Sequence, residues 1–125
     1  MGMDREAFEK LVEKIFEQLP DKFRSSIENV RIIIEDYPSD SLTQQLRLSS
    51  RDQLLGLYQG VPLPYRTSWY GRSPVVPDTI SLYQKNIERR SRTDEELERN
   101  VRETLMHEIG HYFGMTEEEI RSAGY

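Results

Sequence analysis

Apolar residues recur at helical spacing near both ends of the chain. Near the start they recur at steps of three and four residues from about Asp4 to Leu19, and Pro20 ends the run. Near the end, an apolar residue occupies every fourth position of one helix face; these residues are Leu97, Val101, Leu105, Ile109 and Phe113. The pattern predicts a helix over about residues 4–19, a short helical turn after Pro20, and a second long helix from residue 93.

Capping signals set the boundaries of the C-terminal helices. Thr93 and Glu96 have the spacing of a capping box, and Gly114 is a natural helix stop. Thr116 and Glu119 repeat the capping-box spacing. We therefore expect the long helix to end near Gly114 and a short final helix to run to about residue 122.

Three segments between the helices have the composition of strands. Val30 to Glu35 is a β-branched run that predicts a central strand. Residues 54–59 alternate weakly and stop at Gly60, and residues 79–84 form the third strand candidate. The polar residues 38–53 predict an exposed connecting loop, and residues 64–77, which include Trp69, predict a longer one of the kind that is usually functional or mobile.

The order of helix, three strands and two helices predicts an α+β fold in one domain over residues 1–125. The chain contains no cysteine, which excludes disulfides, thiol nucleophiles and cysteine-bound zinc. It has no apolar run of the roughly 20 residues that cross a bilayer, and no signal-peptide pattern. We therefore expect a cytoplasmic protein without a membrane partner.

The net charge of −5 argues against nucleic acid as a partner, but the charge is uneven along the chain. Residues 41–92 carry eight basic and three acidic side chains, between two acidic ends. The run from Glu88 to Arg92 is therefore open to two interpretations. It is either a patch for RNA or another partner, or a solvated face beside the acidic helices, which is the commoner case.

The only two histidines of the chain, His107 and His111, lie four residues apart in the second long helix, with Glu108 between them. Residues at this spacing lie above one another on a helix, so two imidazoles can bind one zinc ion at about 2.0 to 2.1 Å. Glu108 is turned by about 100° from His107, off the metal but beside a bound water. The HExxH spacing therefore predicts a hydrolytic zinc site in which Glu108 is the general base.

The alternative is that the two histidines fell together by chance on a surface or core helix. Relative to Leu105 and Ile109, each histidine lies two residues further on, about 200° around the helix axis. The apolar stripe and the histidines therefore face opposite ways, which favours an accessible site over a buried pair.

A zinc site that cleaves bonds needs a third protein ligand and an open position. The segment continues as HExxHxxGxxE, in which Gly114 allows the chain to turn and Glu117 stands where metzincins have their third histidine. Glu117 is the predicted third ligand and Glu118 the alternate. The competing explanation is that both acids only favour the positive end of the last helix.

With these motifs in place, the sequence resembles the small bacterial zincin-like metallopeptidases, also called minimal zincins. The HExxHxxGxxE segment carries the most specific part of the resemblance, which extends over most of the chain. The other matching segments are the helix ending at Leu19-Pro20, residues 29–36 with Pro38, residues 55–63 with Arg66, and residues 77–83 with Ile87-Glu88.

The resemblance implies a compact zincin-like domain, with an N-terminal helix and an active-site helix on a small mixed sheet. It implies zinc on His107, His111 and Glu117, and hydrolysis of peptide bonds by a zinc-bound water that Glu108 activates. The substrate would be a peptide or protein.

The resemblance also implies that a sheet edge holds the substrate by added strand pairing. That edge would be the strand of Tyr83 or its neighbour. Arg66, Tyr83 and Tyr112 are the candidates for stabilising the oxyanion.

The rival interpretation is a binding module that kept a zinc-stabilised site without turnover. Such a module would hold a protein or nucleic-acid partner with the basic middle of the chain and the loop around Trp69. A glutamate at the position of the general base disfavours this rival. The sequence leaves the oligomeric state and the cleavage specificity open.

Overall fold

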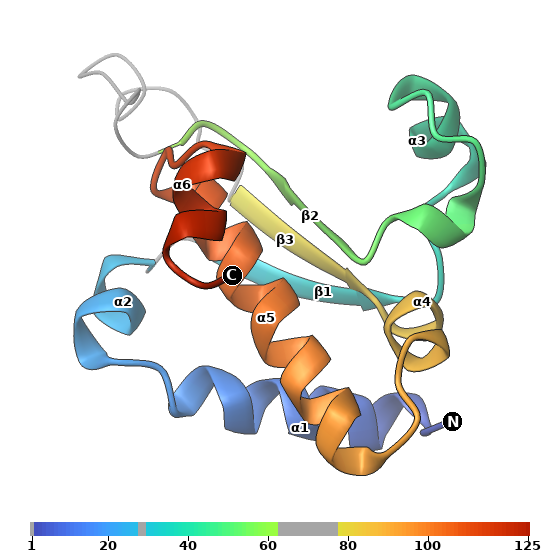
Figure 1. The fold of residues 1–125 in the computed structure, drawn as a ribbon, viewed down its shortest axis with the longest axis horizontal. Helices are drawn as coiled ribbons and strands as arrows, with labels where there is room; N and C mark the ends of the chain where they lie inside the picture. The colour runs from blue at the N-terminus through green and yellow to red at the C-terminus, as the bar shows by residue number, and fades with distance from the viewer. Residues whose placement is uncertain (1, 28–29, 63–77) are drawn as a thin grey trace.

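The computed structural model describes residues 2–27, 30–62 and 78–125, so the predictions for Arg66 and the Trp69 loop lie outside the described residues. The described elements confirm the α+β class and its two long helices (Figure 1). In chain order they are α1 (Arg5–Glu17), α2 (Asp21–Ser26), β1 (Val30–Glu35), α3 (Asp40–Gln45), a 3-10 turn (Arg51–Gln53), β2 (Gly56–Gln59), β3 (Asp78–Tyr83), α4 (Gln84–Arg89), α5 (Asp94–Tyr112) and α6 (Glu117–Ser122).

The three strands form a mixed sheet in the order β1-β3-β2 (Figure 1). β3 runs parallel to β1 and antiparallel to β2, with Gly56 opposite Leu82. The prediction that residues 30–35 form the central strand is wrong, because β1 lies at one edge of this sheet. β3 is central and is buried at five of its six positions, whereas no residue of β1 is fully buried. The serine and threonine of β3 make this strand look less buried in the sequence than it is.

The hydrophobic core lies between α1, the sheet and α5. The apolar stripe of α5 is buried as predicted from Leu97 to Ile109, and Ile80 and Leu82 of β3 meet it from the sheet. α1 adds Phe8, Val12 and Ile15. Among the described residues, none of the helices combines the length and the apolar character needed to cross a bilayer. Since the stripe of α5 faces the core, the opposite face of α5 is left for other contacts.

Residues 39–53 contain no buried residue, as predicted, but they do not form a loop throughout, because α3 and the 3-10 turn lie there. Local capping explains both elements. The Ser39 hydroxyl accepts the N–H of Leu42, and the Ser50 hydroxyl accepts the N–H of Asp52. The predictions also omitted α4, whose buried polar residues give no apolar periodicity. These short elements depend on side-chain hydrogen bonds that periodicity does not register.

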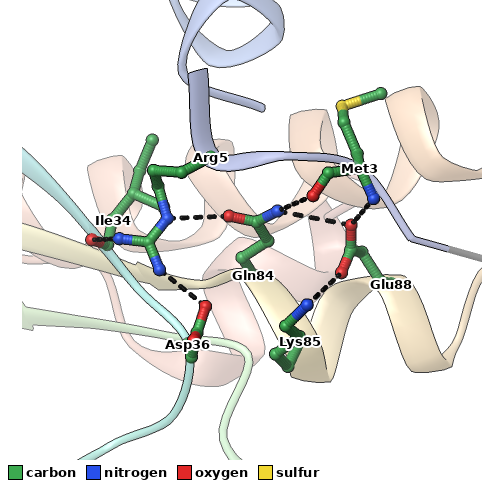
Figure 2. A network of polar contacts seen from close by, with 7 residues as sticks. All are labelled: Met3, Arg5, Ile34, Asp36, Gln84, Lys85 and Glu88. Carbon is green, nitrogen blue, oxygen red and sulfur yellow. Dashed lines mark hydrogen bonds and ion pairs between the residues drawn. The ribbon is translucent and has the colours of Figure 1, made fainter. Parts of the chain in front are cut away.

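A network of polar contacts fastens the N-terminal segment to α4 and β1 (Figure 2). Glu88 is 3% exposed and accepts the N–H of Met3 at 2.7 Å. Arg5 donates to Gln84 Oε1, to the Ile34 carbonyl and to Asp36 Oδ1 at 2.6 to 2.9 Å. Within the basic run predicted as a patch or a solvated face, Glu88 is therefore committed to this network. Its neighbour Arg89 is paired to Asp52 at 2.7 Å.

Candidate metal centre

α5 presents its two histidines on the side away from its buried stripe. Thr93 caps the helix by accepting the N–H of Glu96 at 3.0 Å, which is the contact from Thr93 in the predicted capping box. The side chains of His107 and His111 are 27% and 29% exposed, and their ring centroids lie 5.1 Å apart. The predicted HExxH pair is therefore accessible and on one face of the helix.

The end of α5 is a Schellman motif that reverses the chain toward the histidines. Gly114 has a φ of 81°, and its N–H donates to the His111 carbonyl at 2.9 Å. The N–H of Met115 donates to the Gly110 carbonyl at 3.0 Å. Only a residue that tolerates the left-handed region suits position 114, which explains the glycine of the HExxHxxGxxE pattern.

α6 begins immediately after this turn. Thr116 and Glu119 form the predicted capping box, in which each side chain accepts the other residue's N–H at 3.1 Å. Glu119 is thus committed to the cap, and Glu117 is the first helical residue. Ile120 is 1% exposed and packs against α5 at Gly110, where an added Cβ would lie 2.8 Å from Ile120 Cγ1. The contact between Gly110 and Ile120 therefore sets how closely α6 approaches α5.

The Glu117 carboxylate meets both imidazoles. Its Oε1 lies 2.7 Å from His111 Nε2 and 3.1 Å from His107 Nε2, and its Oε2 lies 3.0 Å from His107 Nε2. Burial raises the pKa of Glu117, but the hydrogen bonds from His107 and His111 outweigh it and the pKa is lowered overall. The alternate, Glu118, is exposed and stands one residue further along α6.

Glu108 is placed differently from Glu117. It is 7% exposed, and its Oε1 accepts the backbone N–H of Tyr58 in β2 at 2.8 Å. Burial raises its pKa, while the two histidines and the bond from Tyr58 partly oppose the shift. Glu108, His107 and His111 each have a potential ligand atom within 4.8 Å of the others. A backbone donor thus holds one carboxylate oxygen of Glu108 beside the histidines.

Sequence reasoning missed the contribution of Tyr58, because Tyr58 and Glu108 are fifty positions apart in the sequence. A weak signal for it exists in Gly56, because a glycine inside a strand pattern often marks a close approach of another element. The strand next to Tyr83, which is β2, supplies the sheet edge beside the site.

Two open cavities of about 550 Å³ each meet at His107 and Glu108, which line both. Leu54 and Gly56 form the β2 side of both cavities. One cavity extends along α5 toward Asn100 and Glu103; the other extends past His111 toward Met115 and Glu117. The two cavities together form a groove between β2 and α5 with the histidines near its middle.

Two of the suggested oxyanion residues do not line this groove. Tyr83 and Tyr112 are each 2% exposed, and neither is among the residues that line the two cavities. Tyr112 packs edge-on against the Tyr58 ring, with centroids 5.8 Å apart. Burial raises the pKa of Tyr83, which further disfavours its ionised form. Both tyrosines therefore act as packed aromatic residues here.

The donors that converge on α5 suit a zinc ion. Two imidazole nitrogens and one carboxylate oxygen are a ligand set that hydrolytic zinc sites use, and here both Nε2 atoms lie within 3.1 Å of the Glu117 carboxylate. The groove leaves this point open to a further ligand, as a catalytic site requires. His107, His111 and Glu117 could therefore hold the metal.

Comparison with known proteins identifies the family and the fold. The model of a family described as zincin-like metallopeptidase matches residues 27–125. A conserved hypothetical protein from Thermus thermophilus has a similar solved structure, with a TM-score of 0.56 and 24% sequence identity. The match covers 89% of this chain and 94% of that chain, and it shows the fold alone. No curated protein matches the sequence.

Proposed function

The chain belongs to the zincin-like metallopeptidase family, and on this premise we propose that it hydrolyses peptide bonds with a zinc ion. His107, His111 and Glu117 would hold the metal, and Glu108 would be the general base. Bound zinc would lower the pKa of its water and polarise the substrate carbonyl.

The different placement of the two glutamates is the observation that carries this proposal. Glu117 is 57% exposed at its side chain and touches both Nε2 atoms. Glu108 is buried and is held by a backbone N–H from the opposite wall of the groove. This difference supports the proposal that Glu117 is a ligand and that Glu108 acts beside the ligands.

Glu108 then has the properties of a proton carrier. Its raised pKa makes it a better base than an exposed glutamate, and only its Oε1 is used by Tyr58. The other oxygen can take the proton of the attacking water. The same oxygen can deliver that proton to the amine nitrogen that leaves when the peptide bond breaks.

The groove suits an extended peptide as substrate. It runs along β2, the strand at the edge of the sheet, and both cavities open onto Glu108. A peptide lying in the groove would extend to both sides of the base, so an internal peptide bond would lie beside it.

A peptide-library assay tests the proposal. The zinc-loaded protein is incubated with a mixture of peptides, and the products are identified by mass spectrometry. We expect cleavage at internal bonds, which a chelator stops and added zinc restores. The variants His107→Ala and His111→Ala should lose both zinc and cleavage. A parent protein that binds one zinc and cleaves no peptide would overturn the enzymatic role and favour a binding module.

A further inference from the structure

β2 and α5 approach each other so closely that only glycine fits at position 56. A Cβ added to Gly56 would lie 2.8 Å from Thr104 Cγ2, 3.0 Å from the Ser81 carbonyl oxygen and 3.3 Å from Glu108 Cγ. The nearest of these atoms belongs to Thr104, which is 7% exposed and whose hydroxyl is bonded to the Asn100 carbonyl at 2.7 Å. Moving Thr104 away would therefore lengthen or break that bond.

The close approach at Gly56 brings the next part of β2 to Glu108. The Leu55 carbonyl accepts the N–H of Tyr83 in β3. Because backbone groups alternate in direction along an antiparallel strand, the N–H and C=O groups of Gly56 and Tyr58 point away from β3. The Tyr58 N–H consequently reaches Glu108 Oε1 at 2.8 Å. Glu108 follows Thr104 by one helical turn, so both contacts lie on the same face of α5.

We propose that β2 is the positioning element of the general base. The Tyr58 N–H fixes one oxygen of Glu108, and Gly56 sets the distance between β2 and α5 at which this bond can form. The inference rests on the proposed function for its catalytic meaning. Gly56 is a positioning residue in this account, because it acts on Glu108 through the strand that it places.

The distance between β2 and α5 matters because a hydrogen bond to a carboxylate is short and strong, and its strength falls steeply as the donor–acceptor distance grows. Such bonds lie near 2.7 to 2.9 Å, and those beyond about 3.5 Å contribute little direct bonding. A Cβ at position 56 must move Thr104 or displace the strand. Displacing the strand by a few tenths of an ångström or more would weaken the bond and free the Glu108 side chain to rotate.

The test compares Gly56→Ala, Thr104→Ser and the double variant with the parent. Thr104→Ser removes Cγ2, the atom nearest to the added Cβ, and keeps the hydroxyl that bonds Asn100. Gly2→Ala is the matched control, because nothing lies within 4 Å of a Cβ at that position. The effect of Gly56→Ala is measured once with Thr104 intact and once together with Thr104→Ser. The difference between the two effects, a double-mutant cycle, isolates the contact between positions 56 and 104.

We expect Gly56→Ala to lower kcat by about 10- to 100-fold, with KM and zinc affinity within about twofold of the parent. In the Thr104→Ser background the same substitution should lower kcat by only about threefold, because the nearest clash is gone. Gly2→Ala should behave as the parent. An equal loss of kcat in both backgrounds would overturn the role of the Gly56 contact, and so would a Gly56→Ala variant with parental kcat.

Amide hydrogen exchange gives a readout that does not depend on turnover. In Glu108→Ala the Tyr58 amide should exchange at least about tenfold faster than in the parent, because its acceptor is gone. The Tyr83 amide, which bonds Leu55, should be unchanged. If the parent cleaves no peptide, the proposed enzymatic role fails, and the exchange experiment still decides whether Glu108 is held by β2. Unchanged exchange at Tyr58 would overturn the inference.

Discussion

Glu117 Oε1 lies 2.7 Å from His111 Nε2, although the two residues belong to different helices. The Schellman motif at Gly114 reverses the chain, and the Thr116 capping box starts α6 at the residue that faces the histidines. The third donor of the candidate metal centre thus depends on a helix end.

The first prediction separates Glu117 from its neighbour. Glu117→Ala leaves two imidazoles for the ion and should weaken zinc binding at least about tenfold. Glu118→Ala is the matched control, since it removes only an exposed charge near a helix N-terminus, worth about 0.3 to 1 kcal/mol of stability. Zinc titration calorimetry on both variants measures the difference. Weaker binding in Glu118→Ala alone would mean that the ligand is the other glutamate.

The second prediction concerns the docking of α6. Helix propensity alone would make Gly110→Ala stabilising by about 1 kcal/mol. The clash with Ile120 at 2.8 and 2.9 Å should reverse that sign and destabilise the fold by about 1 to 3 kcal/mol. Because α6 carries Glu117, zinc affinity should fall by about tenfold as well. Denaturant unfolding and zinc titration check both effects; a more stable variant with parental affinity would contradict them.

The third prediction follows from the raised pKa of Glu108. Burial makes the folded state favour the protonated acid, so ionisation of Glu108 costs stability as the pH rises above its ordinary value of 4.5. Glu108→Gln stays uncharged and can still accept the Tyr58 N–H. We expect the metal-free variant to melt at a higher temperature than the parent at pH 7. The difference should shrink toward pH 4, and a difference independent of pH would contradict the assignment.

The fourth prediction addresses the N-terminal polar network. Arg5→Ala removes three hydrogen bonds to α4 and the end of β1 and should cost about 1 to 3 kcal/mol. Zinc affinity should not change, because Arg5 bonds none of the candidate ligands. Lys10→Ala is the control, since its pair with Glu6 is exposed and worth about 0.3 to 0.5 kcal/mol. Denaturant unfolding gives both stabilities, and an equal cost in the two variants would refute the network's role.

The parts of the site that sequence could predict are those fixed by local rules. The histidines four apart, the Thr93 cap and the Thr116 capping box all lie within one or two helical turns, and each is present. The glycine turn that leads to Glu117 also follows a local rule. These features depend on backbone geometry that a few consecutive residues determine.

The parts that sequence could not predict depend on long-range contacts. The order of the sheet places β3 in the centre, although the isoleucine run of β1 is more apolar. The bond from Tyr58 to Glu108 joins residues fifty apart and uses a backbone N–H that any residue except proline supplies. The tight contact of Gly56 with Thr104 likewise exists only once β2 lies on α5.

The central claim is that Glu117 binds the metal and Glu108 activates water. A matched pair of variants, Glu108→Gln and Glu117→Gln, tests it most directly, since each replaces a carboxylate by an amide of similar size. Zinc content and single-turnover peptide cleavage are measured on both. We expect Glu108→Gln to keep one zinc per chain while cleaving at least about 100-fold more slowly, and Glu117→Gln to lose zinc affinity. Loss of zinc in Glu108→Gln, or cleavage by that variant at the parental rate, would contradict the account.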